Sequence, residues 1–276
     1  MYINLPFPSL GMAGAVLAKV RDFYESHPYP HQDVAGRKDL LSGEHAKVMK
    51  RILATVGMEP DDLKGRRVLD AGCGTGEKAV YCAIHGADVD AFDISERSIG
   101  IARKNAGRLG VRVDFSVAAF EDVNLGKKYD LVLCIGTLHH TEDAKGNFMR
   151  MARAVAKNGR IALGLYNLYG RLACRAQRKL LWAGEREPQR VLEKVGAGKE
   201  RNRTWRAAVS DRFGAPHETY HTVEEVLRWF SEAGFAPVET WPRVKMDSGL
   251  RIRLSQLGWL LKSRGFFFAG GKKISR

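Results

Sequence analysis

Short apolar runs alternate with longer stretches of helical spacing between residues 67 and 166. An unbroken apolar run such as YDLVLCI at 129–135 is typical of a strand that is covered on both faces. Stretches whose apolar residues recur every three or four positions are typical of surface helices. The pattern predicts one strand that begins at Val68 and four further strands at 87–92, 111–117, 129–135 and 160–166. It predicts helices at 77–85, 95–109 and 143–156.

This order of elements indicates an α/β fold. Strands and helices that alternate through short links form a doubly wound, mostly parallel sheet with helices on both faces. The ligand site of such a sheet lies at the carboxyl ends of the strands. Ser95 is placed to cap the helix at 95–109, and Asn158-Gly159 is expected to end the helix at 143–156.

The alternation stops after Tyr166. Residues 167–216 contain no predicted strand, whereas the capping box that starts at Thr222 predicts a helix to about Ala233. A strand at 235–241, a helix at 250–261 and a strand at 265–273 complete the expected elements. We therefore expect one domain over 1–276, made of an N-terminal helical segment (1–60), a cofactor-binding core (61–166), a helical cap insertion (167–216) and the C-terminal part of the sheet (217–276).

The composition fits this expectation. Hydrophobic residues make up 45% of the 276 residues and charged residues 28%, which is ordinary for a globular protein. No run of about 18 apolar residues predicts a transmembrane helix, and the first 18 residues lack the basic start of a signal peptide. The four cysteines form no C-x-x-C pair, so we expect neither a zinc site nor a disulfide framework, and a reducing, cytoplasmic setting.

The net charge of +14 is concentrated in two segments. Residues 171–206 hold 11 basic and 4 acidic side chains, and residues 243–276 hold 9 and 1. Such segments suit peripheral contact with an anionic membrane or an amphipathic acceptor, and they also suit RNA, the less favoured partner. The third alternative is a cap that packs on the core and whose basic side chains simply lie in solvent.

The most informative stretch is the glycine loop VLDAGCGTG at 68–76. Its pattern is G-x-G-x-G, whereas the dinucleotide fingerprint requires G-x-G-x-x-G. Asp70 ends the strand before the glycines, where a carboxylate disfavours a pyrophosphate and favours a cationic ligand without phosphate. Asp93 ends the next strand, where a carboxylate accepts both hydroxyls of a ribose. Glu121 and Asp122 follow the third strand, near the expected position of an adenine amino group.

The glycine loop, the acid after the second strand and YDLVLCIGTLHHTED together resemble the class I S-adenosylmethionine-dependent methyltransferases, over about residues 66–166. The resemblance implies a seven-stranded, mostly parallel, Rossmann-like sheet and S-adenosyl-L-methionine as cofactor. It implies that Asp93 holds the ribose, that Ile94, Ala119 and Phe120 flank the base, and that Glu121 or main-chain groups meet the adenine amino group. The cofactor-binding residues implied in this way are Asp70, Gly72, Cys73, Gly74, Gly76, Asp93, Ile94, Ala119, Phe120, Ile135 and Gly136.

Methyl transfer is an in-line displacement, so a base is needed only where the nucleophile starts protonated. His139 and Tyr166 follow the fourth and fifth strands and are the candidate catalytic residues. The other aromatic and histidine side chains expected near the substrate mouth are Tyr24, His27, Tyr29, His140, His217 and His221. His217 and His221 also match H-E-x-x-H, but Pro216 and the capping box place the motif in a loop, so we expect no metal.

The sequence thus predicts an S-adenosylmethionine-dependent methyltransferase of a small or amphipathic, lipid- or quinone-like acceptor. The alternatives are an RNA methyltransferase, a cofactor-binding module without catalysis, and an NAD-dependent oxidoreductase. Membrane contact would be peripheral, through residues 171–206 and 243–276.

Overall fold

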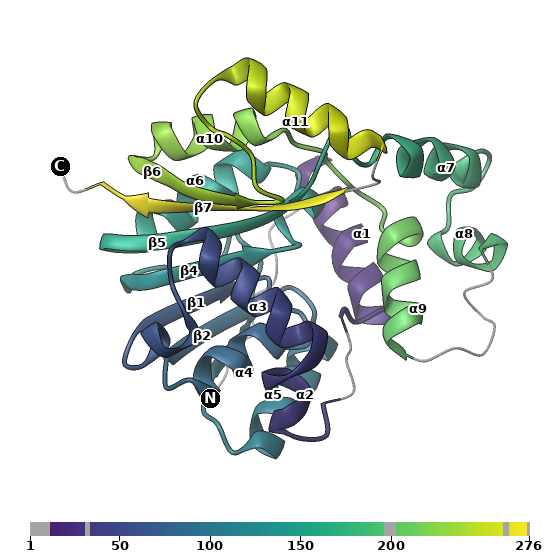
Figure 1. Cartoon of the computed structure of the whole chain (residues 1–276). Helices are drawn as coiled ribbons and strands as arrows, with labels where there is room; N and C mark the ends of the chain where they lie inside the picture. The colour runs from purple at the N-terminus through teal and green to yellow at the C-terminus, as the bar shows by residue number, and fades with distance from the viewer. Residues whose placement is uncertain (1–11, 31–33, 196–202, 262–264, 275–276) are drawn as a thin grey trace.

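The structure is a computed structural model that describes residues 12–30, 34–195, 203–261 and 265–274. Within these ranges the strands form a seven-stranded sheet in the order β3-β2-β1-β4-β5-β7-β6 (Figure 1). The strands β1 to β5 are parallel, and β7 runs antiparallel between β5 and β6. The strands are β1 Arg67–Ala71, β2 Asp88–Asp93, β3 Asp114–Val117, β4 Tyr129–Ile135, β5 Val155–Tyr166, β6 Phe235–Trp241 and β7 Phe266–Lys273. This confirms the predicted α/β fold class.

Helices cover both faces of the sheet. One apolar core joins the sheet to α2 (Arg37–Leu41), α3 (Gly43–Thr55), α4 (Glu77–Ile84) and α5 (Glu96–Leu109). The other core joins it to α6 (Ala144–Ala154), α10 (Val223–Glu232) and α11 (Gly249–Leu261). The remaining helices, α1 (Met12–Ser26), α7 (Leu172–Trp182), α8 (Pro188–Lys194) and α9 (Arg203–Val209), gather at one end of the sheet (Figure 1). That end carries the carboxyl termini of the parallel strands.

Two helix starts read from the sequence are confirmed. The Ser95 hydroxyl accepts the Ser98 backbone N–H at the start of α5, at 3.0 Å. Thr222 accepts the Glu225 N–H at 3.2 Å, and the Glu225 carboxylate accepts the Thr222 N–H in return. Both caps satisfy backbone donors that a helix start otherwise leaves unpaired.

Two predicted boundaries are wrong. The helix predicted to 156 ends at Ala154, and Val155 already pairs with Tyr129, so Asn158-Gly159 lies inside β5. Asn158 has a φ of 63° at the point where the register with β4 shifts, which is an irregularity of the strand and not a helix end. The third strand begins at Asp114 and not at 111, because β2 pairs with it only from Asp90 onward.

No helix among the described residues combines the length and the apolar character needed to span a bilayer. The expected division of the chain at residues 61, 167 and 217 stays a prediction.

Candidate functional site

Three positions of the loop between β1 and α4 accept only glycine. Gly72, Gly74 and Gly76 have φ values of 71°, 54° and 85°. A Cβ at these positions would lie 2.2 Å from the Thr137 side chain, 2.1 Å from the Tyr29 carbonyl oxygen and 2.6 Å from the Ala102 Cβ, respectively. The loop therefore lies in close contact with the end of β4, the segment after α1, and α5.

Asp70 is fully buried at the end of β1. Neither of its carboxylate oxygens has a hydrogen-bond partner among the described residues. Burial raises its pKa to about 6, and nearby Lys78 and the Ala79 backbone, which lower the pKa, only partly offset this. A buried carboxylate without partners is destabilising, so this position suits a ligand that brings a cation or hydrogen-bond donors.

Asp93 joins the second strand to the glycine loop. One oxygen accepts the Gly74 N–H at 2.8 Å and the other accepts the Ser95 N–H at 3.0 Å. Each carboxylate oxygen can accept more than one hydrogen bond, so both keep capacity for further donors. Burial raises the pKa of Asp93, whereas these two backbone bonds lower it.

The other predicted cofactor residues lie around these two acids. Ile94 is half-buried directly after Asp93, whereas Ala119 and Phe120 are buried after β3. The Phe120 ring meets Phe92 edge to face at 5.1 Å. Cys73 is buried in the loop, and Ile135 and Gly136 end β4. Glu121 instead accepts a hydrogen bond from Asn147 of α6 at 3.0 Å.

A second group of polar side chains gathers at the ends of β4 and β5. His139, in the short 3-10 helix Leu138–His140, is fully buried, and neither ring nitrogen has a partner among the described residues. Its ring stacks on Tyr166 with 3.7 Å between centroids. The Arg171 guanidinium lies 3.5 Å from the centroid of the same ring, so it occupies the opposite face. Burial above all, and then His140, Arg171 and His221, hold the pKa of His139 well below its ordinary value, so the imidazole is neutral.

Asp211 connects this group to the cap, and sequence reasoning missed it. It lies in the π-helical turn Ser210–Gly214 and accepts hydrogen bonds from Tyr24 at 2.8 Å and Tyr166 at 2.6 Å. The His140 Nε2 is 3.5 Å from the same carboxylate. Burial raises the pKa of Asp211, but the nearby His140 and the hydrogen bonds from Tyr166 and Tyr24 outweigh it and keep the pKa below its usual value. The only available signal was that Asp211 is the single aspartate in 167–216.

The candidates on the N-terminal segment have different positions. Tyr24 reaches Asp211, whereas the His27 ring stacks on Phe23 within its own segment. The Tyr29 carbonyl accepts the Thr75 N–H of the glycine loop at 3.2 Å. Tyr29 itself is 36% exposed.

The segment 217–221 lies in a loop before α10, as its sequence predicted, and runs beside His139 and His140. The His217 carbonyl accepts a hydrogen bond from the His140 Nδ1 at 2.8 Å, and the Thr219 N–H binds the His139 carbonyl at 2.7 Å. His221 turns away, toward Glu225 at 3.0 Å and the Trp229 ring. The structure thus brings Tyr24, His139, His140, Tyr166 and the backbone of His217 together. Tyr29 contacts the glycine loop instead, and His27 and the His221 side chain lie outside this group.

The buried Glu218 side chain completes the group on the cap side. It pairs with Arg171 at 3.2 Å and with Arg178 at 3.4 Å, and it accepts the Tyr220 hydroxyl at 2.6 Å. The Arg171 Nε still has no partner among the described residues. One nitrogen donor of this ion-pair cluster is therefore left for a further acceptor.

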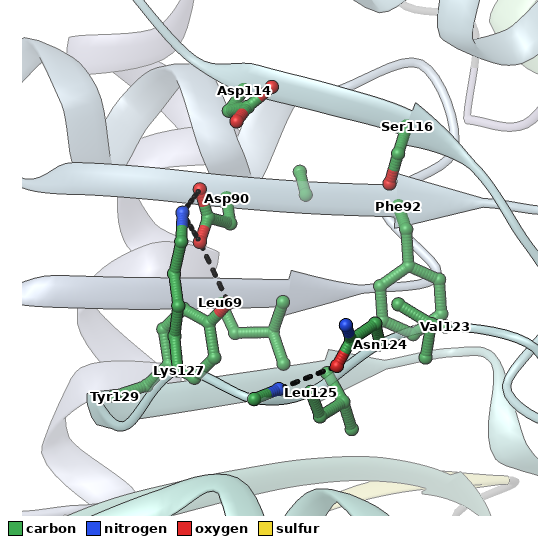
Figure 2. Close-up of a pocket in the computed structure, with 12 residues that line it drawn as sticks. Leu69, Asp90, Phe92, Asp114, Ser116, Val123, Asn124, Leu125, Lys127 and Tyr129 are labelled. Atoms are coloured by element: carbon green, nitrogen blue, oxygen red, sulfur yellow. Dashed lines mark hydrogen bonds and ion pairs between the residues drawn. The ribbon is translucent and has the colours of Figure 1, made fainter. Parts of the chain in front are cut away.

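A separate pocket of about 310 Å³ lies on the face of β1 to β4, under the loop 123–127 (Figure 2). Lys127 and the Tyr129 hydroxyl both bind Asp90 there, at 2.9 and 2.7 Å. None of the predicted cofactor residues lines this pocket. It exists because the described chain between β3 and β4 forms no helix to cover the sheet.

Comparison with known proteins gives a family match. A family model described as a methyltransferase domain matches residues 42–240, which is more than half of the chain. An uncharacterized protein of Synechococcus sp. is 27% identical over 251 residues, covering 81% of this chain and 60% of that protein. A ubiquinone biosynthesis O-methyltransferase of Bordetella parapertussis is 38% identical over 100 residues, covering 36% of this chain and 41% of the enzyme. The chain thus spans less than two thirds of the length of these curated relatives.

Solved structures share the fold. Magnesium protoporphyrin IX methyltransferase from Synechocystis PCC 6803, solved with bound SAM, superposes with a TM-score of 0.58 at 18% identity, covering 97% of this chain and all of that one. A methyltransferase from Mesorhizobium loti gives a TM-score of 0.53 at 18% identity, covering 85% and 100%.

Proposed function

This chain belongs to the family of methyltransferase domains, and we propose that it is an S-adenosyl-L-methionine-dependent enzyme that methylates a small or amphipathic acceptor. The observation that carries the proposal is the buried, unpartnered carboxylate of Asp70 directly before the glycine loop. A dinucleotide would bring its pyrophosphate to this position, where a carboxylate repels it. A sulfonium nucleoside brings an ammonium and a sulfonium group and no phosphate.

The residues present fit this cofactor. Asp70 would hold the ammonium end, and Asp93, whose two oxygens already orient the loop, would accept the ribose hydroxyls. Ile94, Ala119 and Phe120 would flank the base, and Gly72, Gly74, Gly76 and Cys73 would line the methionine part. Ile135 and Gly136 would form the floor at the end of β4.

Bound S-adenosyl-L-methionine supplies a methyl group on a sulfonium, which an aligned nucleophile can displace. His139 is neutral and its ring nitrogens are unpartnered among the described residues, so it can accept a proton from an acceptor hydroxyl. Its low basicity suits a hydroxyl that is already acidic, such as a phenol. Tyr166 cannot act as the base, because its hydroxyl donates to Asp211 and burial holds its pKa well above the ordinary value. In our proposal Tyr166 is a positioning residue that separates His139 from Arg171.

The acceptor is proposed to carry oxygen atoms. Arg171 and His139 offer nitrogen atoms with no partner among the described residues, and such donors are matched by carboxylate, phenol or carbonyl oxygens. The relatives named for ubiquinone biosynthesis and protoporphyrin are consistent with a small oxygen-bearing acceptor.

The test is transfer of radiolabelled methyl from S-adenosyl-L-methionine to separate lipid and RNA extracts. We expect label in the lipid or small-molecule fraction, and none there with His139→Ala, provided that this variant still binds S-adenosylhomocysteine. Label in RNA alone would instead support an RNA methyltransferase. Binding of S-adenosylhomocysteine without transfer to any extract would support a non-catalytic module.

A further inference from the structure

Exposed leucines are concentrated on two helices. Among the described residues, seven leucines are largely exposed, and only Leu41 lies elsewhere than on α7 or α11. The six others are between 40 and 77% exposed: Leu172, Leu180, Leu250, Leu254, Leu257 and Leu260. We call these six residues the leucine surface. Single exposed leucines are common on globular proteins, but a concentration of this kind indicates an interaction surface.

The helix α11 is apolar on two opposite sides. Ile252 and Trp259 face the core and are about 5% exposed or less. Leu250, Leu254 and Leu257, spaced by four and three residues, lie on the other side. A surface helix normally has one apolar face, which it buries against the core. The second apolar face of α11 is left exposed, so we expect a binding partner to bury it.

A buried polar contact fixes the rotation of α11. The Gln256 side chain is fully buried and accepts hydrogen bonds from the Val223 N–H at 2.8 Å and the Asn167 side chain at 3.0 Å. Turning the leucines inward would break both bonds and leave these groups unpaired. The outward position of the leucines is thus part of the packed structure.

The leucine surface falls on the two segments that hold the excess positive charge. Residues 171–206 contain α7 and have a net charge of +7, and residues 243–276 contain α11 and have a net charge of +8. Residues 207–242, between them, have a net charge of −4. Lys179 is exposed beside Leu180, and Lys245 is exposed before α11. Lys272 and Lys273 belong to the opposite end of β7, whereas Arg251 and Arg253 are exposed on α11 itself. Exposed leucines flanked by basic side chains match the interface of an anionic bilayer, which offers acyl chains below phosphate groups.

The leucine surface borders the candidate active site. Gly265, just beyond α11, packs against the stem of Arg171, and its carbonyl accepts the Asn167 N–H at 3.0 Å. Arg171 directly precedes α7 and lies on Tyr166. In Figure 1, α11 lies over the face of the sheet beside α10, and its C-terminal end points toward α7, at the end where the parallel strands end.

We propose that α7 and α11 dock this protein on an anionic lipid bilayer through the leucine surface. Docking in this orientation turns the ends of β4 and β5 toward the membrane. If the proposed methyltransferase function holds, an amphipathic acceptor reaches Arg171 and His139 from the bilayer without crossing water. The docking itself rests only on the surface and its charge.

The experiment is sedimentation of the full chain with vesicles of phosphatidylcholine alone or mixed with phosphatidylglycerol. We expect binding to the mixed vesicles that weakens as salt is added, because the basic segments contribute through screened charge. The double variant Leu254→Glu/Leu257→Glu should bind at least about tenfold more weakly, because both side chains lose their apolar insertion and meet anionic lipid. The matched control is Leu41→Glu, an exposed leucine on α2, which should bind as the wild type does.

Circular dichroism and S-adenosylhomocysteine binding of the double variant should equal those of the wild type. Unchanged circular dichroism shows that the variant is folded, and unchanged S-adenosylhomocysteine binding shows that its cofactor site is intact. A loss of vesicle binding is then due to the changed surface alone. No wild-type binding to mixed vesicles, or equal binding by the double variant, would overturn the docking. If the wild type is a dimer that does not bind vesicles, and the double variant is a monomer, a second copy of the chain covers the surface. RNA binding without vesicle binding would also overturn the proposal.

Discussion

Two groups of buried polar atoms without hydrogen-bond partners among the described residues border the candidate site. At the glycine loop they are the carboxylate oxygens of Asp70, and at the ends of β4 and β5 they include nitrogens of His139 and Arg171. Thr137 lies between the two groups, with its hydroxyl bound to the Gly72 carbonyl at 3.1 Å. This separation of charge suits a cationic donor molecule at one end and an oxygen-bearing acceptor at the other.

The pKa of Asp70 gives a stability prediction. Because the folded state raises this pKa from 3.8 to about 6, folding favours the protonated form. Below about pH 4 Asp70 is protonated in both states and does not lower the free energy of unfolding. As the pH rises from about 4 to 6 the carboxyl ionises, and the free energy of unfolding falls by roughly 3 kcal/mol. Asp70→Asn should therefore make the cofactor-free protein more stable at neutral pH by up to that amount, and should leave its stability nearly unchanged at about pH 4.

Urea denaturation across this pH range measures the difference. Asp122→Asn, at an exposed position, is the control and should change little at any pH. The same Asp70→Asn variant should lose affinity for S-adenosylhomocysteine. A variant less stable than the wild type at neutral pH would contradict the assignment of Asp70 as a destabilising charge kept for a ligand.

At the residue scale, sequence reasoning found groups whose position follows from chain order. Asp70 and Asp93 each end a strand before a tight turn, so their common edge could be predicted. Asp211 could not be predicted, because its partners Tyr24 and Tyr166 are 187 and 45 residues away in sequence. Only the packing of α1 and the cap brings them to one carboxylate.

At the scale of elements, the glycine loop and the segment after α1 depend on each other. Gly74→Ala should disturb both, because a Cβ would lie 2.1 Å from the Tyr29 carbonyl and the φ of 54° strains an alanine. We expect a loss of about 1–3 kcal/mol in the free energy of unfolding and weaker S-adenosylhomocysteine binding.

Thermal denaturation and calorimetry of this variant check both effects. Gly107→Ala is the matched control, since this helical glycine has nothing within 4 Å of an added Cβ and the substitution should stabilise α5. If Gly74→Ala behaves like Gly107→Ala, the contact between the loop and Tyr29 does not exist in solution.

The Asp211 carboxylate holds the cap against α1 and the end of β5 through two hydrogen bonds. Asp211→Ala leaves the hydroxyls of Tyr24 and Tyr166 buried without an acceptor, which destabilises the fold by about 1–3 kcal/mol. Hydrogen exchange should quicken in residues 12–26 and 203–214, while the sheet stays protected. Lys179→Gln, an exposed change on the cap, should leave exchange unaltered, and unchanged exchange in Asp211→Ala would show that other contacts hold the cap.

Element types were predictable where local chemistry decides them. Ser95 and Thr222 are N-cap residues that can be recognised in the sequence, and α5 and α10 begin directly after them. The end of α6 was not predictable, because Val155 becomes a strand residue through pairing with Tyr129, a tertiary contact that overrides the local turn signal of Asn158-Gly159.

At the scale of the whole molecule, the order of the strands places the parts of the site. The sheet order β3-β2-β1-β4-β5-β7-β6 brings the ends of β1, β2, β4 and β5 to one edge, which α1 and the cap cover. The alternation of strands and helices predicted this edge, and charge counting predicted that the cap is basic. Neither could predict which leucines of α11 face outward, because the buried contacts of Gln256 decide that.

The most direct test of the central claim is calorimetric titration of S-adenosylhomocysteine into the wild type and Asp93→Ala, with NAD as the comparison ligand. The account predicts that the wild type binds S-adenosylhomocysteine and not NAD. It also predicts that Asp93→Ala loses about 1–3 kcal/mol of binding free energy, because hydrogen bonds between the charged carboxylate and the ribose hydroxyls disappear. A wild-type protein that binds NAD and ignores S-adenosylhomocysteine, or equal affinity in Asp93→Ala, would contradict it.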